Sequence, residues 1–157
     1  MKNLSGISTN GNQPFSYSLL RQSSYSFNKV VNKIPNWKDK NILIADSDET
    51  NACMLKNFLT KTKATLVNAP NGKRAIELCH SSLQIDLVIM DVFSPEMKGC
   101  KAAKLIKTAN SKLPVIAQAS HMPEKEIKKA LDAGCDGFLE KPVSQEVLFK
   151  VISKFLH

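Results

Sequence analysis

The chain has 157 residues and a formal net charge of +8, with 43% hydrophobic and 6% aromatic residues. This length and aliphatic composition suit one globular domain, and they exclude two full domains or a wholly disordered chain. No apolar stretch approaches the roughly 18 residues that a membrane span needs, and the N-terminus lacks the apolar core of a secretion signal, so we expect a cytoplasmic protein.

Residues 1–38 are predicted to form a flexible polar leader or linker. The segment is rich in Ser and Asn, and residues 1–40 carry six basic residues against one acidic residue. Such a composition buries too little apolar surface to offset the entropy of ordering. Trp37 is expected to pack against the edge of the following domain. A basic tail can bind nucleic acid without sequence preference, but we favour a solubilising role.

From Asn41 onward, short apolar segments alternate with amphipathic ones. Strands are expected at 41–45, 64–69, 85–90, 114–118 and 136–140, and helices at 48–61, 72–82, 97–109, 123–133 and 144–156. The first, third and fourth strands are nearly continuous Ile, Leu and Val, which is typical of strands covered on both faces. Strict alternation of this kind predicts a doubly wound α/β domain over residues 39–157, with helices on both faces of a parallel sheet.

Polar residues follow several of the predicted strands. Asp46, Ser47 and Asp48 come after the first strand, Asp91 after the third and Lys141 after the fifth. In a parallel sheet these positions meet at one edge, where ligands bind. Two carboxylates and a lysine suit phosphoryl transfer, with one carboxylate as the nucleophile, others binding Mg²⁺, and the ammonium binding phosphoryl oxygens. For Asp48 we favour capping of the following helix over metal binding.

The run DSDET also matches the D-x-D-x-T signature of phosphatases that resemble the haloacid dehalogenase family. On that interpretation Asp46 is the nucleophile and Asp48 the acid and base. The interpretation also requires an acidic pair after Lys141, and the remaining residues contain only Glu146. It leaves Asp91 without a role. We therefore reject the phosphatase hypothesis and do not expect an enzyme.

From Lys40 onward the chain resembles the receiver domains of two-component response regulators, especially those attached to hybrid histidine kinases. The segments that carry the resemblance are NILIADSDETN, NAPNGKRAIEL, DLVIMDVFSPEMKG, PVIAQAS and AGCDGFLEKPV. The resemblance implies a flavodoxin-like (CheY-like) fold with a five-stranded parallel sheet in the order 2-1-3-4-5.

The same resemblance implies roles for individual residues. Asp91 matches the phospho-accepting aspartate, Asp46 a residue of the acidic pocket that binds Mg²⁺, and Lys141 the phosphate-sensing lysine. The backbone carbonyl of Phe93 would be a further metal ligand. Phe138 occupies the position of the aromatic switch residue, without a ring hydroxyl.

Two site positions depart from the family pattern. Receivers carry a second acid after the first strand, and here that metal ligand is Ser47, a poor substitute for a carboxylate on a hard cation. They also carry Thr or Ser at the end of the fourth strand, where this chain has Ala119. Ser120 is next to it, but successive strand residues face opposite sides, so Ser120 should not replace the missing hydroxyl. The Mg²⁺ site is therefore expected to be weakened.

Two functions remain open at this point. In the first, a histidine kinase or histidine phosphotransfer protein phosphorylates Asp91, and the domain signals through protein contacts. These contacts would use the face formed by segments 123–133, 136–140 and 144–156, which could also support a homodimer. In the second, the domain is a phosphorylation-impaired pseudo-receiver that acts as a constitutive protein-binding module.

Overall fold

The computed structural model of the protein describes residues 33–157. Most of the leader predicted for residues 1–38 lies outside this range. Among the described residues, no helix is both long enough and apolar enough to cross a lipid bilayer.

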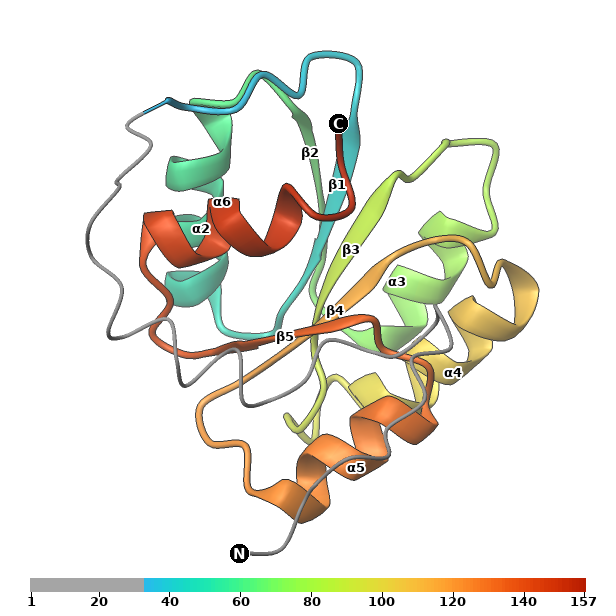
Figure 1. The fold of residues 1–157 in the computed structure, drawn as a ribbon. Coiled ribbons are helices and arrows are strands. Elements are labelled where there is room, and N and C mark those ends of the chain that lie inside the picture. Colours follow the sequence, from blue (N-terminus) through green and yellow to red (C-terminus); the bar gives the residue numbers. More distant parts are fainter. Residues whose placement is uncertain (1–32) are drawn as a thin grey trace, which may run out of the picture.

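Five parallel strands form one sheet in the order β2-β1-β3-β4-β5, as the sequence predicted (Figure 1). Because β1 and β3 are neighbours at the centre, the chain segments that follow these two strands emerge side by side. The strands are β1 (Asn41–Ala45), β2 (Thr65–Ala69), β3 (Leu87–Asp91), β4 (Val115–Ala119) and β5 (Gly137–Glu140).

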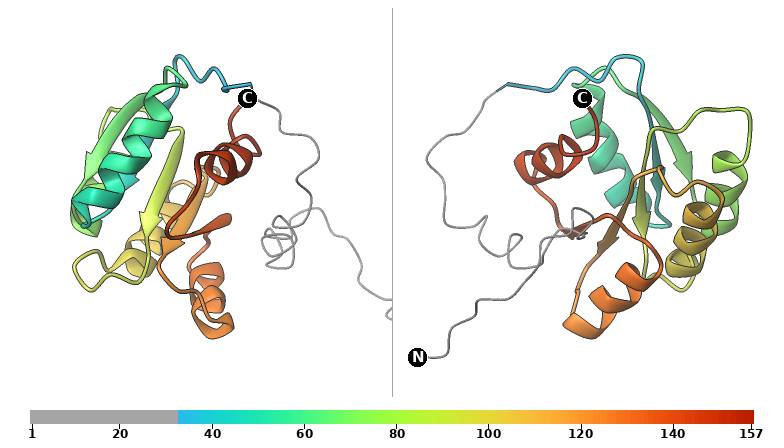
Figure 2. Two further views of the ribbon diagram at one scale, coloured as in Figure 1. Left: turned by 90° about the vertical axis from the view of Figure 1, so that its left-hand side faces the viewer. Right: turned by 45° about the vertical axis from the view of Figure 1, so that its right-hand side comes forward.

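Helices cover both faces of the sheet, so the molecule has three layers (Figures 1 and 2). Helices α2 and α6 pack on one face, and α3, α4 and α5 pack on the other. The helices are α2 (Glu49–Thr60), α3 (Gly72–Cys79), α4 (Gly99–Ala109), α5 (Glu124–Asp132) and α6 (Gln145–Ile152).

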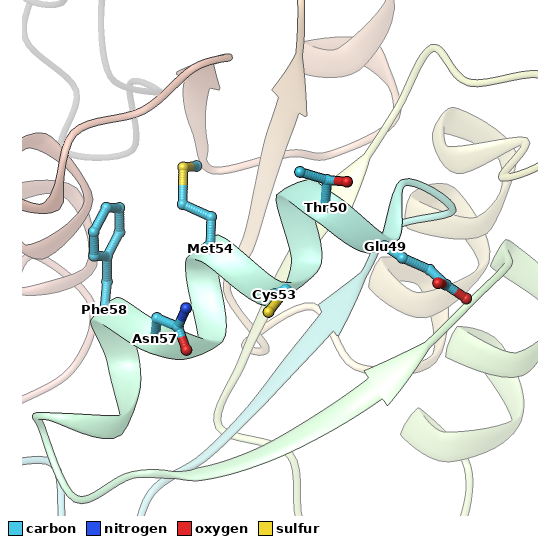
Figure 3. Close-up of a pocket in the computed structure, with 6 residues that line it drawn as sticks. All are labelled: Glu49, Thr50, Cys53, Met54, Asn57 and Phe58. Carbon is cyan, nitrogen blue, oxygen red and sulfur yellow. The ribbon is translucent and has the colours of Figure 1, made fainter.

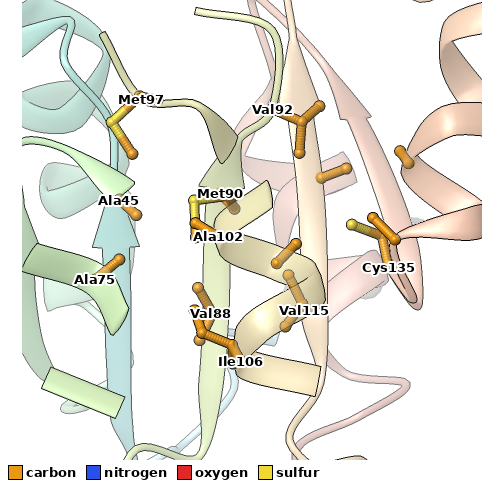
Figure 4. Close-up of a cluster of buried hydrophobic side chains, with 14 of the residues drawn as sticks. Ala45, Ala75, Val88, Met90, Val92, Met97, Ala102, Ile106, Val115 and Cys135 are labelled. Carbon is orange, nitrogen blue, oxygen red and sulfur yellow. The ribbon is translucent and has the colours of Figure 1, made fainter. Parts of the chain in front are cut away.

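Alternation along the strands divides the core into two clusters. On β3, Val88 and Met90 face the helices α3, α4 and α5, where they pack with residues such as Ala102 and Ile106 (Figure 4). Ile89, which lies between them, faces α2 and α6. Because both faces are covered, a continuous apolar run is the stable pattern for a central strand. The same alternation decides on which side each polar residue at a strand end lies.

The strands reach further than predicted at the functional edge. Asp91 is the last residue of β3 and Ala119 the last of β4, whereas the sequence placed both just beyond their strands. The ladder continues because the backbone N–H of Val92 donates to the carbonyl of Gln118 at 3.1 Å. The final helix is shorter than predicted and ends at Ile152, after which the chain continues in tighter turns with bonds between residues three apart.

Trp37 anchors the start of the described chain to the domain. Its ring is 3% exposed and meets the ring of Phe149 edge to face, with 5.9 Å between the centroids. Its backbone N–H donates to the carbonyl of Thr62 at 2.7 Å. The packing expected from the sequence is therefore present, and the packed part of the chain includes Trp37, which lies within the segment assigned to the leader.

Gly99 allows α4 to begin directly against the end of β3. A Cβ at this position would overlap the carbonyl oxygen of Asp91 and lie 2.7 Å from the Cα of Val92. Only a residue without a side chain fits there, because both obstacles are backbone atoms. The glycine thereby fixes the loop that carries the residues after Asp91.

Replacing Gly99 by Ala should therefore lower the free energy of unfolding by about 1–3 kcal/mol, because the loop and helix must shift to relieve the overlap. Urea denaturation measures the effect. Gly137→Ala is the matched control, since a Cβ there would lie 3.5 Å from the Phe155 ring, an ordinary contact. The control should change stability by less than about 1 kcal/mol. Equal losses in the two variants would contradict the close approach at Gly99.

Candidate functional site

Asp46, Asp91 and Lys141 meet at the C-terminal edge of the sheet, as the sequence predicted. The ammonium Nζ of Lys141 lies 3.1 Å from Oδ2 of Asp46 and 3.1 Å from Oδ2 of Asp91. The side chains of Asp46 and Asp91 are 1% and 9% exposed. Two carboxylates this close would repel each other in a buried site, and the shared ammonium offsets part of this repulsion by attracting both.

Asp46 is the more deeply fixed of the two carboxylates. Its Oδ1 accepts from the backbone N–H of Asp48 at 2.8 Å, and its Oδ2 accepts from Nδ2 of Asn51 at 2.7 Å, in addition to Lys141. The carboxylate is therefore held by the turn after β1 and by the first turn of α2. Such bonds fix both its position and its charge.

Asp91 is held more loosely. Its Oδ1 accepts from the backbone N–H groups of Phe93 and Ser94, both at 3.3 Å, which is the long end of the hydrogen-bond range. Its Oδ2 accepts from the ammonium of Lys141 at 3.1 Å. Asp91 is also the more exposed carboxylate. Of the two, it is thus the one that an incoming reagent can reach.

Lys141 reaches both carboxylates from across the sheet. Its backbone N–H donates to the carbonyl of Ala119 at 2.8 Å, so the residue begins beside the end of β4. Since β4 lies between β5 and β3 in the strand order, the lysine side chain must pass over the end of β4. A long, flexible cation suits this span.

The environment of Lys141 keeps it protonated. Burial lowers the pKa of the ammonium, but the hydrogen bond to Asp46 and the negative charge of Asp91 more than offset this effect, so the pKa lies above its ordinary value of 10.5. Because the pKa is raised in the folded state, protonation of Lys141 stabilises the fold fully at neutral pH. This contribution to the free energy of unfolding is lost as the pH rises through the raised pKa.

The Ser47 hydroxyl is bonded to another side chain and is not a free metal ligand. Its hydroxyl lies 2.9 Å from the hydroxyl of Ser94, which in turn donates to Oε2 of Glu96 at 2.7 Å. Because the carboxylate only accepts, Ser94 uses its proton there and Ser47 must donate to Ser94. The bond from Ser94 also lowers the pKa of Glu96. The turn after β1 is thus tied to the loop after β3 by a chain of hydroxyls.

Asp48 caps α2, which confirms the role favoured from the sequence. Its Oδ1 accepts from the backbone N–H groups of Thr50 at 3.0 Å and Asn51 at 3.3 Å. Asn51 and Ser94 were missed as site residues. Asn51 gave a visible signal, since it is a polar residue on the inner side of an amphipathic helix. Ser94 gave none, because its partner Ser47 lies 47 residues away in the chain.

The positions expected to relay a signal lie on the other face. Ala119 and Phe138 are both buried in the cluster beneath α3, α4 and α5. The Phe138 ring is 1% exposed. Ser120 is exposed beyond the end of β4.

The oxygen donors suit a hard cation in kind but are few. Asp46 and Asp91 supply carboxylate oxygens, and Phe93 lies in the loop directly after Asp91. Within residues 33–157, no group of three or more His, Cys, Asp or Glu side chains is arranged to hold a metal ion. A divalent cation would therefore have to rely on two carboxylates together with backbone or water oxygens.

An open groove runs along the outer side of α2, next to the acidic edge (Figure 3). It begins at Glu49 and Thr50 in the first turn of the helix and ends at Asn57 and Phe58. Its surface is mostly apolar, with Met54 and Cys53 between the polar ends.

Replacing Lys141 by Met should cost about 3–5 kcal/mol of folding free energy at neutral pH, because Asp46 and Asp91 would be buried without a counter-charge. Urea denaturation at pH 7 measures the loss. The same change at exposed Lys128 is the control and should stay within about 0.5 kcal/mol. A loss at Lys141 no larger than at Lys128 would mean that the ammonium does not hold the two carboxylates together.

Comparisons with known proteins agree with this geometry. The family model of the response regulator receiver domain matches residues 42–153. The chain is 30% identical over 107 residues to a cyclic di-GMP phosphodiesterase of Thermotoga maritima, covering 68% of this chain and 28% of that protein. It is 28% identical to the hybrid signal transduction histidine kinase I of Dictyostelium discoideum, covering 71% and 7%, and 27% identical to the two-component response regulator ORR11 of Oryza sativa, covering 73% and 80%. The chain thus spans less than a third of the first two relatives.

Solved structures give the same result. A chain in the co-crystal structure of the Saccharomyces cerevisiae histidine phosphotransfer signaling protein Ypd1 with the receiver domain of Ssk1 is 27% identical, with a TM-score of 0.69 over 78% of this chain and 90% of that chain. A two-component response regulator from Clostridium difficile is also 27% identical, with a TM-score of 0.68 over 74% and 94%. The chain therefore belongs to the response regulator receiver domain family of two-component systems.

Proposed function

We propose that Asp91 accepts a phosphoryl group from a phosphohistidine of a histidine kinase or a histidine phosphotransfer protein. The observation that carries this proposal is the contact of one ammonium, that of Lys141, with both Asp46 and Asp91 at 3.1 Å. We assign the receiver domain to residues 39–157 together with Trp37, which packs against Phe149, and a leader to the residues that precede Trp37.

In the proposed step, a carboxylate oxygen of Asp91 attacks phosphorus while the bond from phosphorus to the histidine nitrogen breaks. The imidazole leaves with the bonding electrons, and Asp91 becomes an acyl phosphate. Lys141 neutralises part of the charge on the transferring oxygens, because its ammonium already lies against Asp91. Asp46 keeps that lysine in place through its own ion pair.

Mg²⁺ is the expected cofactor, held by Asp46, Asp91 and the carbonyl of Phe93, and it would neutralise charge on the phosphoryl oxygens. Charge balance favours this assignment. An aspartyl phosphate with about two negative charges, together with Asp46, Lys141 and one divalent cation, carries no net charge. Asp48 is assigned to capping of α2 rather than to the metal.

Signalling is proposed to occur through protein contacts. The groove on α2 lies beside the acceptor edge, where a phosphodonor protein must approach. Output contacts, including a possible homodimer, are assigned to the face formed by α5, β5 and α6. Phe138 is the candidate for relaying a change at the site to that face, since its ring lies in the core beneath α5.

A second candidate function is a binding module that is not phosphorylated. The observation that favours it is the hydroxyl chain from Ser47 through Ser94 to Glu96. A serine hydroxyl that is already bonded adds no charge to a cation site. On this alternative, the ion-paired site is a permanent structural element.

Beryllofluoride with Mg²⁺, which mimics a phosphoryl group on an aspartate, separates the two functions. If Asp91 is an acceptor, the mimic should shift the amide NMR signals of residues around Asp91 and Lys141. Asp91→Asn is the control and should abolish the shifts, since the nucleophilic oxygen is replaced. No shift in the unaltered protein at millimolar Mg²⁺ would overturn the phosphoacceptor proposal and leave the binding module.

Replacing Ser47 by Asp should strengthen Mg²⁺ binding by roughly tenfold or more, because a further carboxylate adds charge beside a hard cation. Titration calorimetry measures the affinity. Ser94→Ala is the control, since it breaks the hydroxyl chain without adding charge and should leave the Mg²⁺ affinity unchanged. An unchanged affinity in the Ser47 variant would mean that position 47 does not face the cation.

A further inference from the structure

Gln118 is an unexplained polar residue in the core. It lies on β4 within the run PVIAQA, and its side chain is fully buried, with 0% exposure. Among residues 33–157, it is the residue whose buried side-chain polar atoms, Oε1 and Nε2, have no hydrogen-bond partner. Burying an amide without hydrogen-bond partners destabilises the protein. The buried amide of Gln118 therefore needs an explanation.

The register places Gln118 beside the acceptor. Its direct neighbours in the sheet are Asp91 on β3 and Leu139 on β5. Paired residues of parallel strands point to the same face, and Ile116 and Leu139 belong to the cluster beneath α2 and α6. Gln118 therefore lies on the face from which Asp91 and Lys141 meet. Neighbouring strands are about 4.8 Å apart, a gap that a glutamine side chain can span.

Lys141 lies at the same edge of the sheet as Gln118 and Asp91. The lysine begins beside the end of β4, where its backbone N–H donates to the carbonyl of Ala119, and its ammonium reaches Asp91 and Asp46 on the far side of that strand. The carboxamide is shielded from water, yet Nε2 offers two donors with nothing to receive them. A group with free acceptor oxygens at Asp91 would satisfy them, and a phosphoryl group is such a group.

We propose that Nε2 of Gln118 donates a hydrogen bond to an oxygen of the phosphoryl group on Asp91. This inference rests on the proposed function, because it requires Asp91 to carry that group. Gln118 would supply from the acceptor's own face the donor that Ala119 lacks. It is a ligand of the phosphorylated state, and the unsatisfied amide is the cost that the unphosphorylated state carries.

The test compares unaltered protein with Gln118→Met, which keeps the length of the side chain and removes the amide. Beryllofluoride in the presence of Mg²⁺ is the probe, with its affinity measured by titration calorimetry and the urea midpoint measured without it. We expect Gln118→Met to bind beryllofluoride roughly tenfold more weakly, the loss expected for one bond to a charged group. Its urea midpoint should rise, because no buried amide is left unsatisfied.

Three further variants serve as controls. Gln84→Met makes the same chemical change at an exposed position outside the sheet, and should alter neither quantity. Adding Ala119→Thr to Gln118→Met should restore beryllofluoride affinity, because a hydroxyl at position 119 again supplies a donor. Gln118→Leu provides a second apolar variant should the methionine disturb the fold.

The possible outcomes distinguish the role of Gln118 from the proposed phosphorylation of Asp91. Beryllofluoride binding that is unchanged in both apolar variants would overturn the role of Gln118 and leave Asp91 as the acceptor. Absence of binding in the unaltered protein would overturn both. Weaker binding together with a lowered urea midpoint would also contradict the inference, since it would mean that the amide stabilises the free protein.

Discussion

The arrangement of the functional edge depends on one ammonium placed between two buried carboxylates. Asp46 and Asp91 come from the adjacent central strands β1 and β3, so the fold itself forces two like charges together. Lys141 makes this tolerable, because it follows β5, which is two strands from β3, and its ammonium reaches both carboxylates. Removing the cation would leave two buried carboxylates without the ammonium that they share.

The sequence was sufficient for the fold and for this central triad because both depend on local pattern. Apolar runs ending in a charged residue mark the strands, and parallel strands bring their ends to one edge. Asn51 and Ser94 escaped because their roles depend on how two loops approach each other. Gln118 was visible as a polar exception in an apolar strand, but the absence of any partner for its amide is a property of the packed core.

The serine at position 47 changes how the site is held in the absence of a cation. Two carboxylates against one ammonium already leave one excess negative charge, and a third carboxylate would add another, which a metal ion would relieve. Ser47 is instead connected through Ser94 to the carboxylate of Glu96, which is exposed. On the proposed function, we therefore expect an edge that depends less on a metal ion and binds cations more weakly. The affinity of this edge for a cation therefore decides between the two functions, since phosphorylation of Asp91 needs the cation and the binding module does not.

The face on which Gln118 lies determines which helices would respond to phosphorylation of Asp91. Position 119 faces the cluster that contains Phe138 beneath α3, α4 and α5, whereas position 118 faces α2 and α6. A hydroxyl at 119 would connect a phosphoryl group to the layer with Phe138. A donor at 118 connects it instead to the layer where Leu139 and Leu148 pack. Because a one-residue step along a strand changes the face, moving the donor by one position would move the mechanical response from one side of the sheet to the other.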